Sequence, residues 1–284
     1  MLLANAAFPG VVEVATVDHQ LRSESAAEAK FVATVCADLG VQHKILPVKV
    51  EAGNLQQEAR EARYQALSKW MAKRRLTALA TAHHADDQTE TLLVRLNRGS
   101  GLSGLAGIRS TTSAPGGARL VRPLLQWRRS ELDEIVRAAG LDAVADPSNA
   151  DPRYDRARMR LSLADADWID PRGFAKSAAL LEQAERALDQ VIENEFWDCC
   201  EGGDPYAYFP YLRGDYGREP IWIGIVGYMA QQFAVRLDRG DAAKLVEALR
   251  RGDRANVCGV QAWCEDRGGR TVWLVARESP RRTG

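Results

Sequence analysis

The chain has 284 residues, of which 46% are apolar and 27% charged, a composition typical of a soluble globular protein with one large or two ordinary domains. Its 38 basic and 38 acidic residues cancel, so any nucleic-acid binding must come from local patches rather than from a global field. The five cysteines form no Cys-x-x-Cys pair, which argues against a zinc site and favours a reduced, cytoplasmic protein. The longest apolar run, residues 221–230, has about half of the ~20 residues that a membrane span needs, and the N-terminus lacks the pattern of a signal peptide.

The N-terminal half alternates strand-like and helix-like segments. The predicted strands are 11–17, 41–48, 76–82 and 119–125. The first of these is a continuous β-branched run, which is typical of a strand buried on both faces. The predicted helices begin at Ser25, after Asn54, at Asp86 or Asp87, and at Ser130. Such alternation predicts an α/β fold with a doubly wound, mostly parallel sheet.

The second half has a different character. Residues 99–118 are rich in Gly, Ser, Thr and Pro and are predicted to form a loop, and Asp146–Asn149 a turn. A long helix is predicted over 175–196, and the run 221–230 reads as a buried core helix. Strand-like runs at 257–263 and 271–276 flank Gly268-Gly269 and predict a β-hairpin. We therefore expect a catalytic α/β domain over 1–165 and a smaller, mainly helical domain over 172–284 that ends in this hairpin.

Ionisable residues gather where two of the predicted strands end. The first strand is followed by Asp18 and His19, and the third by His83, His84, Asp86, Asp87 and Glu90. In an open α/β sheet, ligands bind beyond the carboxyl ends of the strands, so these groups are expected to face one crevice. Asp87 and Glu90 are three residues apart and share one helix face. Taken singly, each carboxylate is also explained as a helix cap or a partner of the helix dipole; together with two histidines, they favour a site.

Several motifs follow one another in the order seen in a known family. They are Val17-Asp18-His19-x-Leu21-Arg22, His83-His84-x-Asp86-Asp87-Gln88-x-Glu90-Thr91, Arg95-Leu96-x-Arg98-Gly99-Ser100-Gly101-Leu102, Arg122-Pro123-Leu124-Leu125, Asp146-Pro147-Ser148-Asn149 and Tyr154-Asp155-Arg156-Ala157-Arg158-Met159-Arg160. With these motifs, residues 11–163 resemble the tRNA(Ile)-lysidine synthetases of the PP-loop (N-type) ATP pyrophosphatase superfamily. Ala157 departs from the family pattern, which has Asn there. The family's Ser-Gly-Gly-x-Asp-Ser loop, which cradles ATP phosphates, would precede Met1, and its strand would be central, which would leave the neighbouring strands with unpaired edges.

The resemblance implies an activity. Such enzymes use ATP and Mg²⁺ to adenylate the wobble cytidine of a tRNA(Ile) with a CAU anticodon, and free L-lysine then displaces AMP to give lysidine. It implies three groups of site residues. The catalytic residues would be His84, Asp87, Glu90 and Arg95; the ATP side would be lined by Asp18, His19 and Arg22; tRNA would contact Arg98, Arg122, Arg156 and Arg160. Asp87 is also the candidate metal ligand. Residues 172–284 would grip the tRNA body, and the resemblance also admits a homodimer.

Three other functions compete with this one. A metal-dependent phosphoesterase would use Asp18, His83, His84 and Asp87 as ligands, a donor set that suits Zn²⁺ or Mn²⁺. A non-catalytic tRNA-binding remnant would bind tRNA but neither ATP nor lysine. A related tRNA thiolase would need cysteine pairs for sulfur chemistry, and the sequence has none that suit it.

Overall fold

The structure is a computed structural model, and it describes residues 1–20, 25–48, 55–142, 155–163, 166–210 and 217–278. The chain divides into two compact units, residues 1–182 and 183–284. The division falls inside one long helix, α8 (Pro171–Cys199), eleven residues or more beyond the junction expected from sequence at 165–171. Of the predicted turns and caps, Asp146–Asn149 and Asn54 lie outside the described residues.

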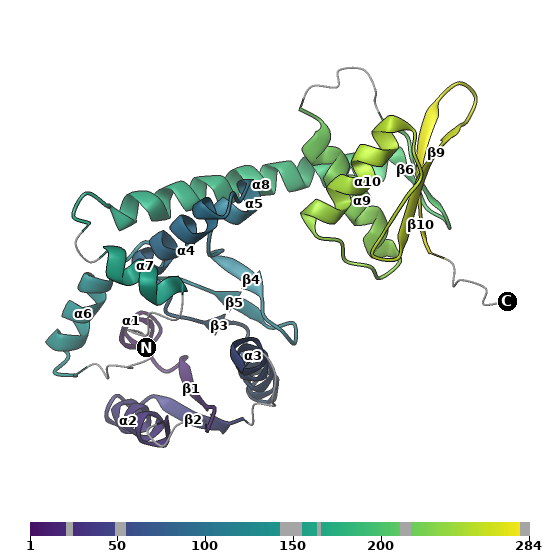
Figure 1. The fold of residues 1–284 in the computed structure, drawn as a ribbon. Helices are drawn as coiled ribbons and strands as arrows, with labels where there is room; N and C mark the ends of the chain where they lie inside the picture. Colours follow the sequence, from purple (N-terminus) through teal and green to yellow (C-terminus); the bar gives the residue numbers. More distant parts are fainter. Residues whose placement is uncertain (21–24, 49–54, 143–154, 164–165, 211–216, 279–284) are drawn as a thin grey trace. The chain divides into compact units, whose positions relative to one another are not determined.

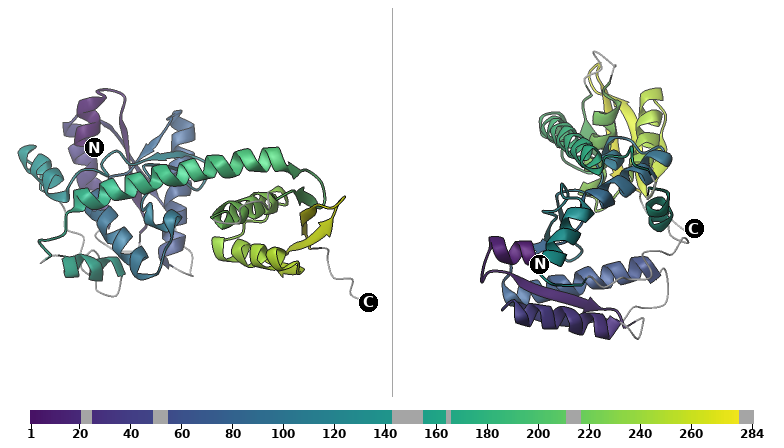
Figure 2. Two further views of the ribbon diagram at one scale, coloured as in Figure 1. Left: turned by 90° about the horizontal axis from the view of Figure 1, so that it is seen from above. Right: turned by 90° about the vertical axis from the view of Figure 1, so that its left-hand side faces the viewer.

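The first unit begins with a parallel pair of strands. Its first elements are α1 (Leu2–Ala7), β1 (Glu13–Asp18), α2 (Ser25–Asp38), β2 (Gln42–Pro47) and α3 (Leu55–Arg74). Strands β1 and β2 run parallel, with Glu13 opposite Gln42 and Asp18 opposite Pro47. Helices α2 and α3 lie on opposite sides of this pair (Figure 2). Gly40 follows the end of α2 and adopts the left-handed backbone that a glycine tolerates best after a helix.

A second sheet of the first unit follows. Its elements are β3 (Leu79–Ala80), α4 (Ala85–Asn97), α5 (Leu102–Leu105), β4 (Thr111–Ser113), β5 (Arg119–Val121), α6 (Arg129–Ala138) and α7 (Asp155–Leu163). Strand β5 lies between β3, to which it is parallel, and β4, to which it is antiparallel. The segment 99–118, predicted to be a loop, therefore contains a short helix and an edge strand (Figure 1).

Helix α3 packs across both sheets. Tyr64, Leu67 and Met71 form a buried stripe at helical spacing, and this stripe contacts residues of β1, β2, β3 and β5. Among the described strands, β1 pairs only with β2 and β3 only with β5. Every residue of β1 is accordingly half-buried, so the prediction of burial on both faces was wrong. The apolar run is shielded by helices on its faces, but one edge of the strand has no described ladder partner.

The second unit packs helices against an antiparallel sheet. Apart from the end of α8, its elements are β6 (Cys200–Glu201), β7 (Tyr206–Tyr208), α9 (Glu219–Gln232), α10 (Arg239–Arg251), β8 (Ala255–Val257), β9 (Val260–Asp266) and β10 (Thr271–Arg277). The sheet order is β6-β7-β10-β9-β8. The core includes Trp222, Met229, Leu245 and Trp273, all at least 98% buried.

The predicted C-terminal elements are present with one correction. Helix α9 contains the whole apolar run 221–230, and β9 and β10 form the hairpin whose turn carries Gly268 and Gly269 with positive φ. The predicted strand over 257–263 is instead two strands, because Cys258 and Gly259 both adopt positive φ and turn the chain between β8 and β9. None of the described helices is long and apolar enough to cross a membrane.

Candidate active site at the carboxyl edge of the first unit

Helix α3 shows that the strands of both sheets end at one edge. Near its C-terminus, Arg74 pairs with Glu13 at the start of β1, with an Nη2–Oε1 distance of 2.7 Å. In its first half, Arg63 lies against His19, just beyond the end of β1. Tyr64 of the same helix contacts Arg122, which follows β5. The carboxyl ends of β1 and β5 therefore meet beside the N-terminal half of α3, the edge where α/β sheets bind ligands.

The N-terminus of α4 is capped by a histidine rather than by an aspartate. The helix begins at Ala85, and the His84 ring accepts the Asp87 backbone N–H while the Asp87 carboxylate accepts the His84 backbone N–H at 3.0 Å. This is a capping box in which an imidazole replaces the usual hydroxyl. The expectation that Asp86 or Asp87 begins the helix was off by one or two residues. Both side chains keep some exposure, 16% for His84 and 20% for Asp87.

Asp86 connects this helix start to α6. Its carboxylate accepts the Arg129 backbone N–H at 2.8 Å and lies 3.7 Å from the Arg128 guanidinium and 3.5 Å from His84. Burial raises the pKa of this carboxyl, but the contacts with His84, Arg129 and Arg128 outweigh burial and lower the pKa to about 2. Asp86 is therefore an anion that holds α6 to the site.

The Glu90 carboxylate is buried beneath an arginine of α7 that binds both of its oxygens. The residue is 3% exposed, and its two oxygens accept Arg160 Nε at 2.7 Å and Nη2 at 3.1 Å. The same guanidinium lies 3.8 Å from Asp87. The hydrogen bond that Arg160 donates to Glu90 raises the pKa of its guanidinium despite partial burial. One arginine thus joins the two carboxylates that were predicted to share a helix face, and it docks α7 on α4.

Two further residues of α4 hold the segment that follows it. Arg95 donates to the carbonyl oxygens of Gly104 and Gly107 at 2.7 and 3.0 Å. Buried Gln88 donates to the Ile108 carbonyl at 3.0 Å and accepts the Ile108 N–H at 2.6 Å. Gly107 has φ +64°, and a Cβ there would lie 2.4 Å from the Gln88 side-chain oxygen. The Gly-rich stretch is ordered by these contacts, which composition alone did not indicate.

Asp18 and His19 lie at the end of β1 as expected. Asp18 accepts the Gln20 backbone N–H at 2.9 Å and the Ser25 hydroxyl at 2.7 Å, and both bonds lower the pKa of its carboxyl. Ser25, predicted as a helix cap, is thus bonded to Asp18. His19 accepts from Arg63, and burial followed by the charge of Arg63 lowers the pKa of its ring.

Of the remaining predicted residues, Arg98 and Arg122 are described and two others lie outside the description. Arg98 forms the C-cap of α4 and is exposed. Arg122 is 7% exposed and donates to the Arg109 carbonyl at 2.6 Å. Arg22 and the side chain of Arg156 lie outside the described residues. The sequence interpretation missed Gln88, Arg60 and Arg63, although the spacing of Arg60, Arg63 and Tyr64 already placed them on one helix face.

The described residues include no group of three His, Cys, Asp or Glu side chains that could hold a metal ion. Asp18, His83, His84 and Asp87 are all described, so the ligand set of the alternative phosphoesterase does not converge. A magnesium ion is commonly held by one or two carboxylates plus substrate phosphates, so a lone carboxylate such as Asp87 is compatible with an ion that arrives with a nucleotide.

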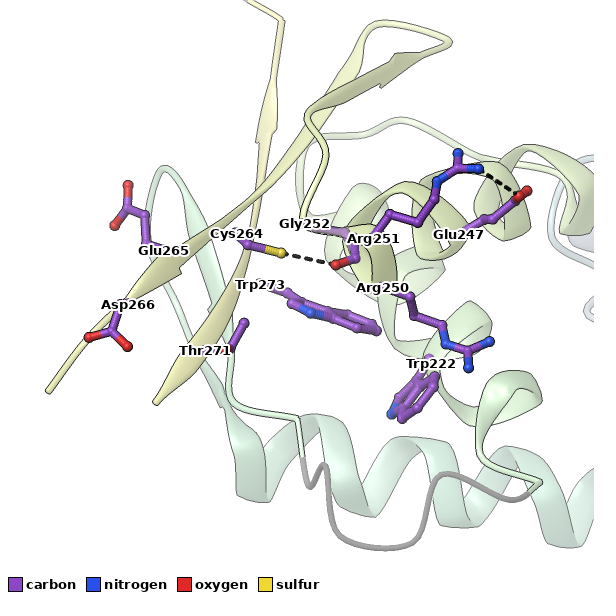
Figure 3. Close-up of a pocket in the computed structure, with 11 residues that line it drawn as sticks. Trp222, Glu247, Arg250, Arg251, Gly252, Cys264, Glu265, Asp266, Thr271 and Trp273 are labelled. Carbon is purple, nitrogen blue, oxygen red and sulfur yellow. Dashed lines mark hydrogen bonds and ion pairs between the residues drawn. The ribbon is translucent and has the colours of Figure 1, made fainter. Parts of the chain in front are cut away.

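Each unit also has a cavity lined by other residues. The one in the second unit measures about 740 Å³, and Figure 3 shows Arg250 above the Trp222 ring, 5.5 Å from its centroid, and Arg251 bonded to Glu247. Cys264 donates to the Leu249 carbonyl on its wall. Its three carboxylates and two arginines leave an excess of one negative charge. A smaller cavity of about 290 Å³ lies between α1, α2 and α6 and is lined almost wholly by apolar side chains.

Comparisons with known proteins agree with this geometry. A family model described as the PP-loop domain matches residues 3–166. The chain is 49% identical over 201 residues to a tRNA(Ile)-lysidine synthase of Novosphingobium aromaticivorans, covering 70% of this chain and 62% of that protein. It is 45% identical over 200 residues to the tRNA(Ile)-lysidine synthase of Zymomonas mobilis, covering 69% and 61%. The chain thus spans about three fifths of the length of these relatives.

A solved structure shares the fold. The U34-tRNA thiolase NcsA from Methanococcus maripaludis, solved with its 4Fe-4S cluster, superposes with a TM-score of 0.50 at 16% identity, covering 64% of this chain and 66% of that one. At this identity the likeness concerns the fold alone.

The chain therefore belongs to the PP-loop domain family, whose model matches more than half of it. The predicted α/β, Rossmann-like fold is confirmed. Within the family, the curated relatives support an assignment to the tRNA(Ile)-lysidine synthases, as the motifs around Asp18 and His84 indicated.

Proposed function

We propose that this chain attaches L-lysine to C2 of the wobble cytidine of a tRNA(Ile) with a CAU anticodon, at the expense of ATP. Lysidine, AMP and pyrophosphate would be the products. The observation that carries the proposal is the meeting of His84, Asp87 and Arg160 at the carboxyl edge of a PP-loop domain. The identity of 45–49% to two lysidine synthases supports it independently.

The first step would be adenylation of the cytidine. Its C2 oxygen attacks the α-phosphorus of ATP, and the bond to pyrophosphate breaks. Asp18 and His19 line the nucleotide side of the crevice, and Arg22 belongs to the same proposal. The structure offers a test of fit, because His19 Nδ1 and Arg122 Nε are buried nitrogens without a hydrogen-bond partner. Donors in this condition suit an anionic ligand. Mg²⁺ would come with the ATP phosphates and meet Asp87.

The second step would be attack by lysine. The amine nitrogen forms a bond to C2, the bond from C2 to the adenylated oxygen breaks, and AMP leaves with that oxygen. The amine must be neutral to attack and must lose a proton as the bond forms. We assign this proton to Asp87, which keeps 20% of its side chain exposed. His84, bonded to Asp87, would stabilise charge on the departing AMP.

We propose more specific roles for the other candidates. Both Glu90 oxygens are bound by Arg160, so we propose that Glu90 positions this arginine rather than taking a proton. Arg95 would act through the loop 104–107, whose carbonyls it binds. Arg160, with Arg156 on the same helix, would face tRNA phosphate, and Arg98 would make an outer contact.

The second domain would bind the tRNA body. Arg254 lies 4.8 Å above the Trp263 ring, and a guanidinium on an aromatic face suits contacts to nucleic acid. Arg254→Gln should weaken tRNA binding and reduce the salt slope of log K by about one. An unchanged slope would remove Arg254 from the interface. The same binding experiment, run with sedimentation, would also test the homodimer that the resemblance admits.

The direct test of the function is turnover. The chain is incubated with a tRNA(Ile) CAU transcript, ATP, Mg²⁺ and isotopically labelled lysine, and nucleosides are analysed by mass spectrometry. Labelled lysidine, with AMP and pyrophosphate in equal amounts, is the expected result. Binding of tRNA without any lysidine would favour the inactive remnant instead. Metal-dependent hydrolysis that needs no lysine would favour the phosphoesterase.

A further inference from the structure

Two arginines of α3, Arg60 and Arg63, bring positive charge to the carboxyl edge, and Tyr64 lies beside them. Arg60, Arg63 and Tyr64 are three and four residues apart, so they share the face that points to the strand ends. The Arg60 guanidinium lies 5.0 Å above the Tyr64 ring, a cation–π distance. Arg63 donates from Nε to His19 Nε2 at 3.3 Å. Both arginines are exposed at this edge, whereas Tyr64 is buried beneath them.

Two donors beside these arginines are buried and lack an acceptor. Since His19 Nε2 accepts from Arg63, the neutral ring carries its proton on Nδ1, and that nitrogen has no hydrogen-bond partner. Arg122 Nε is buried without a partner as well, although another nitrogen of the same guanidinium donates to the Arg109 carbonyl. A buried donor without an acceptor is costly, because it has given up its hydrogen bond to water. Two such donors at one edge indicate that an acceptor belongs there.

The local charges also call for an anion. Arg122 is 7% exposed, and burial together with the repulsion from Arg60 lowers the pKa of its guanidinium. The carboxylates nearby are engaged elsewhere: Asp18 accepts from Gln20 and Ser25, and Glu182 accepts the Ser110 hydroxyl at 3.2 Å. Glu182 offsets part of the Arg122 charge. Three guanidinium groups therefore face these two partly occupied carboxylates.

We propose that Arg60, Arg63 and Arg122, with His19 Nδ1, form a phosphate-binding site on the α3 side of the crevice. The proposal rests on the proposed function, since both substrates that carry phosphate, ATP and tRNA, would approach this edge. Phosphate supplies several strong acceptors, which would satisfy both orphaned donors and neutralise the arginines. The triphosphate of ATP and the backbone of tRNA share this chemistry, and the experiment separates them.

The experiment uses the whole chain and the variants Arg60→Gln, Arg63→Gln and their double. Both residues are exposed, so the fold should persist, which circular dichroism and thermal melting will check. Lys69→Gln is the matched control, because it removes one exposed charge from the opposite face of the same helix. Affinities are measured by calorimetry for pyrophosphate and ATP, and by filter binding for the tRNA transcript over a range of salt concentrations.

We expect each substitution to weaken the binding of the phosphate ligand that uses this site by roughly tenfold. This is the effect of losing one charge-assisted hydrogen bond. A loss confined to pyrophosphate and ATP would assign the site to the nucleotide. A loss confined to tRNA, with the salt slope reduced by about one per arginine, would assign it to the RNA backbone. If the folded double variant binds all three probes like Lys69→Gln, or if the wild-type chain binds none of them, the site does not exist.

Lysidine formation by the wild-type chain separates this inference from the proposed function. Turnover by the wild-type chain together with unchanged binding by the double variant would refute the phosphate site alone. Arginine-dependent pyrophosphate binding without any lysidine would refute the function and leave the site standing. As a further check, Arg60→Lys should recover part of the affinity, because it restores the charge but not the forked geometry.

Discussion

Polar residues in the first turn of helix α4 differ in burial and in partners from those in its second turn. In the first turn, His84, Asp86 and Asp87 are each between 16% and 28% exposed, and they bond chiefly to one another and to the start of α6. One turn later, Gln88 and Glu90 are 3% exposed and are engaged by Ile108 and Arg160. A dense run of ionisable residues thus contains groups that can meet a substrate and groups that hold neighbouring segments in place.

The second unit shows that a partly buried ion pair alone does not mark a site. Glu195 there accepts from Arg218 and from the Tyr208 hydroxyl. Burial and then the hydrogen bond to Glu195 raise the pKa of Tyr208, whereas Arg218 acts in the opposite direction. This network lies against the packed helices and sheet of the unit core. The Glu90–Arg160 pair differs because it lies 3.8 Å from a partly exposed carboxylate, Asp87, at the ligand edge of a sheet.

The largest effect on activity should come from the partly exposed first turn of α4. Asp87→Asn keeps a side-chain oxygen that can accept the His84 backbone N–H of the capping box, so the fold should remain intact. Lysidine formation should fall by about 10²–10⁴-fold, the usual contribution of a general base. The measurement is the initial rate of lysine incorporation into tRNA, with circular dichroism as the check on folding. Turnover at the wild-type rate would show that Asp87 takes no proton. The greater exposure of the first turn of α4 would then have no role in catalysis.

Disrupting the buried contacts of the second turn of α4 should lower the stability of the fold instead. Glu90→Gln removes the buried charge that accepts two hydrogen bonds from Arg160 and leaves this arginine beside Asp87 at 3.8 Å. Removing one member of a buried pair typically costs about 3 kcal/mol, and we expect a loss of up to that size. Urea unfolding followed by tryptophan fluorescence measures this loss. Asp133→Asn is the control, since its ion pair with Arg129 is exposed and is worth less than about 1 kcal/mol. Equal effects of the two substitutions would contradict the structural role assigned to Glu90.

A smaller loss is expected where α4 holds the following segment. Gly107→Ala would force a left-handed backbone on alanine and place Cβ 2.6 Å from a Leu92 methyl group, for a cost of about 2 kcal/mol. The same substitution should accelerate hydrogen exchange at the Ile108 amide, whose N–H donates to Gln88. Gly101→Ala is matched to it, because nothing lies within 4 Å of a Cβ there. Unchanged exchange at Ile108 would mean that Gln88 does not hold this segment.

These contacts mark the limit of what the sequence could predict. Periodicity and capping patterns were enough to place α2, α3 and α9, because they depend on neighbours in the chain. The cluster at His84 could be found for the same reason. The pairs His19–Arg63 and Glu90–Arg160 join residues 44 and 70 positions apart, so no local pattern reveals them. Gln88 is polar yet buried, and only its two bonds to a backbone 20 residues away explain that.

The smallest effect concerns Asp86 and depends on pH. Its pKa in the folded chain is about 2, below the ordinary value of 3.8, so ionised Asp86 stabilises the fold at neutral pH. This contribution is fully present above the unfolded-state pKa and is lost as pH falls toward 2. Since the side chain is 28% exposed, we expect Asp86→Asn to cost on the order of 1 kcal/mol at pH 7.

The measurement is the urea midpoint of both proteins between pH 7 and pH 2.5. The two midpoints should differ by a constant amount down to about pH 4 and then converge, because protonation removes the charge that the substitution has already removed. If the difference between the two midpoints grew as the pH fell, Asp86 would be held in its protonated form. The conclusion that ionised Asp86 joins α4 to α6 would then be wrong.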